Sequence, residues 1–347
     1  MKLFLTFFLF SFLLLGSCKP KQKADDDFDK LSFMSDLADQ CIITNYEELI
    51  VQINDLELAY STFLANQNGS NFNALKTAWK NAYLKWQSVE GFEFGPAMTN
   101  GLRAAVATFP TDTTKLLNNI SAGSYDLSLI TNLDAIGFSS LDFLFFRTNA
   151  INYFSANTVY QQYTADVIHK MKLEVDQVKN QWLTFRSTFI NSTGTESTSL
   201  FSIFINEFNK EYELCKNAKL GIPIGRQSLG IPQPNYLEAR NSGISLELLR
   251  ANILALKNIY LGGTGMGCDD YLHHLEKGTT SNQIIDRFDL IISQIDNLNG
   301  TLEELISSNP AALETLYNTM QGLVVLIKTD MASNFGVLIT YQDNDGD

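Results

Sequence analysis

Histidine is scarce in this sequence, with 3 residues among 347. His169 lies among charged residues on a predicted helix, and the adjacent His273 and His274 would point in different directions on a helix. The sequence contains no HExxH motif, no GxSxG motif and no phosphate-binding loop of the P-loop type. Hydrolytic chemistry at a standard motif is therefore not supported.

Cysteine is also rare, and the four residues are Cys18, Cys41, Cys215 and Cys268. No CxxC spacing is present, so the pattern indicates neither a zinc ribbon nor a dithiol redox site. If Cys18 carries lipid, three thiols remain and at most one disulfide can form among them. The sequence does not say which two would pair.

Basic residues are outnumbered, with 25 Lys and Arg against 38 Asp and Glu and a net charge of −13. Nucleic-acid binding depends on basic side chains that neutralise phosphates, so we expect no nucleic-acid partner. After the N-terminal segment, no apolar run approaches the roughly 20 residues that a membrane-spanning helix needs. The length allows one or two domains with a large core.

The N-terminus has the pattern of an export signal. Lys2 precedes an apolar run over residues 3–15, which is too short for a membrane span but suits a signal peptide. The run ends in Leu-Gly-Ser-Cys at Cys18, which resembles the lipobox of bacterial lipoproteins; an ordinary secretory signal is the alternative. We expect a signal peptide over residues 1–17, lipid on Cys18 and a flexible charged tether over residues 18–27. The expected location is the cell envelope, anchored by lipid to the outer membrane, on its periplasmic face or at the cell surface.

The dominant hydrophobic period in the rest of the chain is helical. Apolar residues recur every three or four positions over residues 160–189, 284–298 and 313–327, and residues 28–64 and 72–92 also read as helices. Asn309-Pro310 predicts the start of the third of these stripes, and residues 66–69 break the chain between the two N-terminal helices. No alternating strand pattern is seen, so the predicted fold class is all-α.

A polar, aperiodic segment over residues 191–195 divides the chain near its middle. Each half has enough helices for a bundle, and we expect helical-bundle domains at residues 28–190 and 200–347. Residues 221–230 are rich in glycine and proline and predict a loop.

Carboxylates in apolar surroundings mark the candidate site. A helix continuing from Trp79 to Glu93 would place Glu90 on one face with aromatic residues, where a carboxylate needs a partner or a cation. An ion pair with an arginine such as Arg103 is the alternative to a binding role. Ser139 and Asp142 are spaced to share a helix face within GFSSLDFLFF, where a helix N-cap or a buried hydrogen-bonded pair would also explain them.

Five sequence blocks resemble the imelysin family, also called the M75 peptidase family. They are WQSVEGFEFGP, GFSSLDFLFF, KLGIPIG, NYLEARNSGISLELLRANILAL and the ending FGVLITYQDNDGD, which together reach from about Trp79 to the C-terminus. The resemblance implies two helical bundles that look like a duplication, with a site in the cleft between them. It also implies an exported protein, often a lipoprotein, in a family with links to bacterial iron uptake.

The chain departs from the family motif Gly-x-His-x-x-Glu. The matching positions are Gly137, Ser139 and Asp142, and a serine hydroxyl is a poor ligand for zinc or ferrous iron. A metal site would need Glu90, or Glu238 and Ser242 from the matching block of the second half. Such a site would be rich in oxygen and would suit a harder cation. The resemblance thus implies iron or another divalent cation, with Glu90 and Asp142 as metal ligands. The full predicted ligand-binding set is Glu90, Gly137, Ser139, Asp142, Glu238 and Ser242.

The resulting hypothesis is an imelysin-like envelope lipoprotein that binds a ligand or metal ion in the interdomain cleft and takes part in iron acquisition. Its expected partners are the membrane, through the lipid on Cys18, and outer-membrane iron-transport components. No catalysis is assigned. The alternatives are a metallopeptidase, disfavoured by Ser139 in place of the histidine, and a surface interaction module whose site has decayed.

Overall fold

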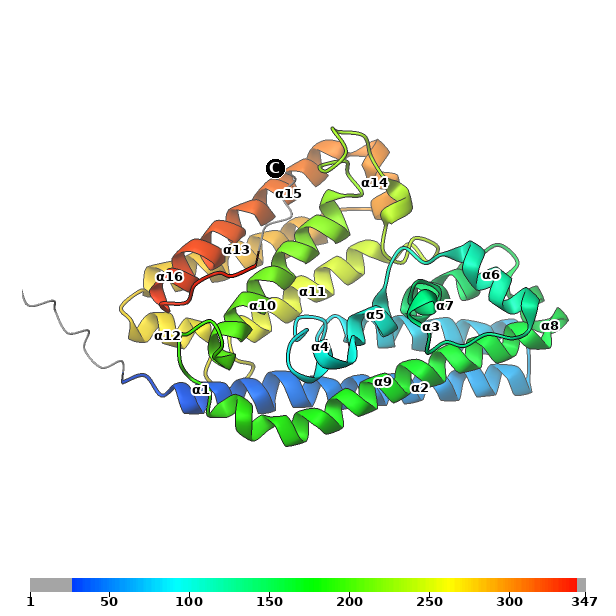
Figure 1. The fold of residues 1–347 in the computed structure, drawn as a ribbon. Helices are drawn as coiled ribbons and strands as arrows, with labels where there is room; N and C mark the ends of the chain where they lie inside the picture. The colour runs from blue at the N-terminus through cyan, green and yellow to red at the C-terminus, as the bar shows by residue number, and fades with distance from the viewer. Residues whose placement is uncertain (1–26, 342–347) are drawn as a thin grey trace, which may run out of the picture.

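A computed structural model describes residues 27–341 of the chain (Figure 1). The predicted signal peptide, the lipidation site Cys18 and nearly all of the tether lie outside the described residues. Among the residues described, no helix is long and apolar enough to cross a membrane.

The N-terminal half, residues 27–190, is built on three long helical stretches. α1 (Lys30–Asp36), the π-helix η1 (Leu37–Ile43) and α2 (Thr44–Ala65) follow one another without a break. After a short loop come α3 (Gly69–Trp86) and, later in the chain, α9 (Thr158–Ile190). Figure 1 shows α2 and α9 side by side along one edge of the molecule, and α2 also contacts α3.

Local signals account for where these helices begin. The Asp29 carboxylate accepts a hydrogen bond from the Ser32 N–H at 3.0 Å, and Asn68 caps α3 by accepting from the Asn71 N–H at 2.9 Å. The predicted break at residues 66–69 is confirmed, as are the helices expected over residues 28–64 and 160–189.

The predicted continuation of α3 to residue 92 is wrong. α3 ends at Trp86, and the chain passes into turns in which the Ser88 and Val89 N–H groups donate to carbonyls three residues back. Such tighter bonds end many helices, and Gly91 adds a residue of low helix propensity. Glu90 therefore lies in a turn and not on the helix.

Shorter helices complete the N-terminal half, and most of them pack along α9. They are α4 (Pro96–Asn100), α5 (Leu102–Ala107), α6 (Thr113–Ala122), η2 (Ile130–Ala135), α7 (Gly137–Phe146) and α8 (Ala150–Ala156).

The C-terminal half, residues 200–341, is a second group of packed helices (Figure 1). α10 (Leu200–Leu214) continues into the π-helix η3 (Cys215–Gly221), and α15 (Pro310–Val324) continues into the π-helix η5 (Val325–Met331). The remaining elements are η4 (Pro234–Tyr236), α11 (Ser245–Tyr260), α12 (Cys268–His274), α13 (Gly278–Asp296), α14 (Leu302–Ser308) and α16 (Ala332–Asn334). Pro310 is the first residue of α15, as predicted. The loop predicted at residues 221–230 lies at residues 222–233, because Gly221 still belongs to η3.

One hydrophobic core runs through both halves. α11 contacts α3, and Phe28 at the N-terminus stacks on Tyr271 at 4.4 Å between ring centroids. The all-α fold class is confirmed, since no strand occurs between residues 27 and 341. The division into two domains, with an apparent duplication, stays a prediction. Cys41, Cys215 and Cys268 are buried free thiols.

Candidate functional site

A buried lysine joins the two halves. Lys219, on η3 of the C-terminal half, is 2% exposed, and its ammonium donates to Glu238 at 2.8 Å and to Glu90 at 3.2 Å. It also donates to the Gln87 side-chain oxygen at 2.9 Å. Glu90 and Gln87 follow α3 in the N-terminal half, whereas Glu238 precedes α11. We call these four residues the junction cluster.

The charges of the junction cluster depend on one another. Burial alone would lower the pKa of Lys219, but the charges of Glu238 and Glu90 outweigh it, and the pKa lies above its ordinary value. Burial raises the pKa of Glu238, and the charge of Lys219 lowers it in part. The cluster is therefore a buried ion triad with its own internal cation.

A second, partly buried ion pair lies beside the first. Arg103, on α5, donates through Nη2 to the Glu211 carboxylate and to the Glu90 backbone oxygen, both at 2.5 Å. Asn252, on α11, donates to the other Glu211 oxygen at 3.2 Å. Burial raises the pKa of Glu211 to about 6, against the opposing charge of Arg103. This pair also crosses from one half to the other.

Asp142 binds the backbone of the opposite half. Its two carboxylate oxygens accept from the Asn241 N–H at 2.9 Å and from the Ser242 N–H at 3.0 Å, and the Asn241 amide adds a third bond at 2.9 Å. Burial raises the pKa of Asp142, while these hydrogen bonds lower it in part. The carboxylate thus holds the loop before α11 against α7.

Ser139 lies near Tyr83 and Glu238. The Tyr83 hydroxyl, Ser139 Oγ and Glu238 Oε1 are buried, and none has a hydrogen-bond partner of good geometry among residues 27–341. Burial, together with the charge of Glu238, raises the pKa of Tyr83 well above its ordinary value. These three oxygen atoms thus form a buried polar patch between the junction cluster and α7.

The backbone at Gly137, the first residue of α7, requires a glycine. Its φ is +83°, and an added Cβ would lie 2.3 Å from the Val106 backbone oxygen. Only glycine lets α7 approach the end of α5 so closely. Its direct contacts are therefore with backbone.

A cavity of about 400 Å³ opens beside these groups, and we call it the junction cavity. Glu93, Arg103 and Phe109 line it from the N-terminal half, and Ala218 and Tyr236 line it from the C-terminal half. Burial raises the pKa of Glu93. Lys219 lies 5.7 Å from the centroid of the Phe109 ring, so the cavity adjoins the junction cluster.

Four of the six predicted site residues form two hydrogen-bonded groups where the halves meet, whereas Ser139 has no such partner among the described residues and Gly137 contacts the Val106 backbone within its own half. Glu90 and Glu238 share Lys219, whereas Asp142 and Ser242 form a separate contact. The predicted metal ligands Glu90 and Asp142 thus have different partners. Over the described part of the chain, no group of three His, Cys, Asp or Glu side chains could hold a metal ion. As arranged here, the carboxylates do not fit a resident metal.

Sequence reasoning missed Lys219, Glu211 and Asn252, and named Arg103 only as a partner for a glutamate. A signal was present in the stripe Phe201, Phe204, Phe208, Glu211, Cys215 and Lys219, which steps by three and four. Charges on an apolar helical stripe are buried only when they are paired. Lys219 also lies in a π-helix, a feature frequent at functional sites.

Comparison with known proteins agrees with this architecture. The peptidase M75 family model, described as Imelysin, matches residues 42–329. Iron-regulated protein A of Synechococcus elongatus is 21% identical over 315 residues, which cover 85% of this chain and 80% of that protein.

Two crystal structures share the fold. An imelysin-like protein from Psychrobacter arcticum has a TM-score of 0.78 at 15% identity, over 90% of this chain and 97% of that one. A putative iron-regulated protein A precursor from Parabacteroides distasonis has a TM-score of 0.76 at 17% identity, over 92% of this chain and 97% of that one.

Proposed function

The chain belongs to the imelysin family, and from this premise we propose that it is an iron-related envelope lipoprotein that binds its ligand in the junction cavity. The iron-related role is supported by the names of two relatives, the iron-regulated protein A of Synechococcus elongatus and the putative iron-regulated protein A precursor of Parabacteroides distasonis. Those names speak of regulation by iron. They do not name a ligand.

The observation that carries the proposal is the junction cavity itself. Its walls come from both halves, and Arg103 brings a charged group to it. Its volume of about 400 Å³ falls within the range of small-molecule sites. A ligand held between the halves would contact both of them and could bias how they pack.

The charges of the junction cluster favour a small-molecule ligand, such as a metal chelate, over a bare metal ion. Lys219 already neutralises Glu90 and Glu238 from within hydrogen-bond distance. A bare cation would have to displace this ammonium and leave it buried without a partner, which is costly. We therefore propose that iron reaches the site as a chelate whose anionic groups face Arg103.

Calorimetric titration of the purified protein tests this proposal, with ferric citrate, iron-free citrate, ferrous salt and zinc salt as probes. We expect saturable binding of ferric citrate and none of the two bare salts. Ala218→Trp, at a partly buried position on the cavity wall, should abolish binding by filling the cavity. The matched control Ala65→Trp, at the exposed end of α2, should bind like the parent.

Two outcomes would contradict the ligand proposal. One is that no probe binds, and the other is that Ala218→Trp binds as well as Ala65→Trp. Saturable binding of a bare salt that Glu90→Gln abolishes would favour a metal site at the junction cluster.

Anchoring through Cys18 is a separate part of the proposal. The protein should incorporate radiolabelled fatty acid and sediment with outer membranes, and Cys18→Ser should lose both properties. A Cys18→Ser protein that remains labelled would refute the assigned lipid site. Crosslinking in intact cells, followed by identification of the captured proteins, tests the proposed contact with outer-membrane iron-transport components.

A further inference from the structure

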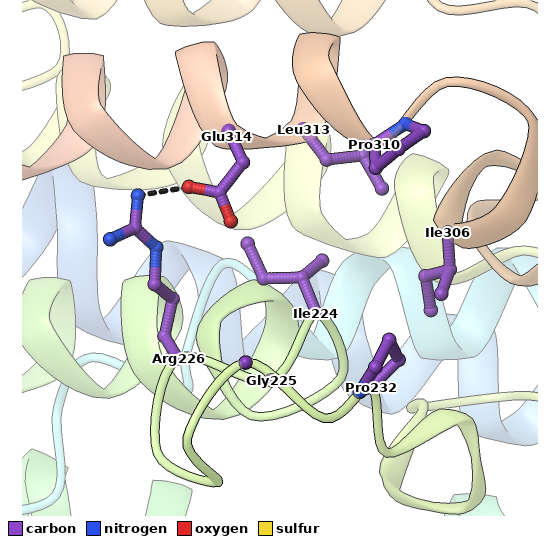
Figure 2. Close-up of a pocket in the computed structure, with 9 residues that line it drawn as sticks. Ile224, Gly225, Arg226, Pro232, Ile306, Pro310, Leu313 and Glu314 are labelled. Atoms are coloured by element: carbon purple, nitrogen blue, oxygen red, sulfur yellow. Dashed lines mark hydrogen bonds and ion pairs between the residues drawn. The ribbon is translucent and has the colours of Figure 1, made fainter.

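A second pocket lies wholly within the C-terminal half and shares no lining residue with the junction cavity. It is bounded by the loop at residues 222–233, by α14 and by the start of α15, and its volume is about 370 Å³. We call it the C-terminal pocket. Figure 2 shows its apolar side chains facing a common space: Ile224, Pro232, Ile306, Pro310 and Leu313.

One side of the C-terminal pocket is charged. Arg226, on the loop, forms an ion pair with Glu314 on α15, and the two are the only charged residues among those that line the pocket (Figure 2). Their side chains are 36% and 42% exposed, so a ligand can reach both. Arg226 Nη2 also donates to the Asn318 side chain at 3.1 Å, and its remaining N–H groups can bind a further acceptor.

The loop wall is already fixed by its own backbone. The Gln233 N–H donates to the Pro223 oxygen at 2.8 Å, and the Gly230 N–H donates to the Gly225 oxygen at 3.0 Å. Gly225 has a φ of +93°, and an added Cβ would lie 2.7 Å from the backbone carbon of Ile231. The pocket is therefore preformed, which lowers the ordering cost of binding.

The charge pattern selects among ligands. A lone anion would meet Glu314 next to Arg226, and a lone cation would meet Arg226 next to Glu314, so each would be repelled by one member of the pair. A zwitterion can place its carboxylate on Arg226 and its ammonium on Glu314. The apolar walls then favour a zwitterion that also carries an apolar side chain.

We propose that the C-terminal pocket binds a small zwitterion of the α-amino acid class with a large apolar side chain. The charged head lies at Arg226 and Glu314, and the side chain enters the space lined by Ile306 and Pro310. The site shares no lining residue with the junction cavity, so it is additional to the function proposed above.

Calorimetric titration of the purified full-length protein with L-leucine and L-phenylalanine tests this site. Three comparison compounds each lack one feature: leucinamide lacks the carboxylate, N-acetyl-leucine lacks the ammonium, and glycine lacks the side chain. We expect each to bind at least about tenfold more weakly than the better of the two amino acids.

Two variants remove different parts of the site. Arg226→Gln removes the carboxylate partner, and Ile306→Trp fills the space from a partly buried position. Each should weaken binding by about tenfold or more. The control is Arg240→Gln. Arg240 also forms an ion pair with a glutamate, Glu303, and the side chains of this pair are 41% and 42% exposed, close to the values for Arg226 and Glu314. It should bind like the parent.

The proposal is overturned if neither amino acid gives saturable binding to the parent protein. It is equally overturned if a folded Ile306→Trp protein binds as the parent does, or if leucinamide and N-acetyl-leucine bind as tightly as leucine. Circular dichroism establishes that each variant is folded. If Ile306→Trp does not fold, the surface variant Arg226→Gln and the comparison compounds still decide the outcome.

Discussion

Replacing Lys219 with methionine should destabilise the protein strongly, although methionine fills a similar volume. In the described part of the chain, Glu90 and Glu238 form ion pairs only with Lys219. Its removal leaves two buried carboxylates without compensation. Breaking a buried ion pair in this way costs about 3–5 kcal/mol.

The size of this loss should depend on pH. Burial raises the pKa of Glu238, and without Lys219 the pKa rises further because the attraction that lowers it is gone. A carboxyl group whose pKa is raised in the folded state favours folding at low pH, and this contribution is lost as the pH rises through the folded-state value. The deficit of Lys219→Met should therefore be larger at about pH 8 than at about pH 5.

Urea unfolding followed by circular dichroism, at both pH values, measures the deficit. The control is Lys257→Met, because Lys257 pairs at 2.6 Å with the exposed Asp289 on the surface, where loss of the pair should cost no more than about 1 kcal/mol. Adding Glu238→Gln to Lys219→Met should restore part of the stability by removing one of the uncompensated charges. A loss for Lys219→Met no larger than the control, or a loss that grows as the pH falls, would refute the reasoning.

Three further predictions concern Gly137 and the contacts between the halves. Gly137→Ala should cost about 3 kcal/mol or more in urea unfolding, because its Cβ would meet the Val106 backbone, whereas Gly101→Ala, also at positive φ but with open space around it, should cost about 1–2 kcal/mol; equal losses would contradict the steric argument. Asp142→Asn should cost about 1–3 kcal/mol, because an amide nitrogen would face a backbone N–H donor, and proteolysis should become faster in the loop at residues 239–243. Because burial raises the pKa of Glu211, its contribution to the free energy of unfolding is lost as the pH rises from about 4 to about 7, and Glu211→Gln should remove this part of the pH dependence; an unchanged slope would exclude Glu211 as its source.

Helices were predicted well where the signal is local. The stripe over residues 160–189 became α9, and Asn309-Pro310 became the start of α15. Periodicity and capping depend on residues within a few positions of one another, so the sequence contains them directly. The predicted end of α3 was wrong because aromatic and acidic residues keep a helical spacing as far as Glu90. The helix itself ends at Trp86.

By itself, the sequence determined that the chain is all-α, and it singled out carboxylates that the structure places in two separate hydrogen-bonded groups. Glu90 and Asp142 could be chosen because charged groups in apolar surroundings need partners, whereas Glu238 was chosen from the resemblance to the family. Which partners they have was decided by the tertiary structure. Lys219 is 129 residues from Glu90 and 19 from Glu238, and Asp142 bonds to backbone about 100 residues away. The contacts of Glu90 and Asp142 form only when the two halves dock, whereas Lys219 meets Glu238 within the C-terminal half after the intervening loop folds back. No local pattern in the chain encodes either contact. The same is true of the C-terminal pocket, whose charges on Arg226 and Glu314 are 88 residues apart in sequence and meet only after the loop packs on α15.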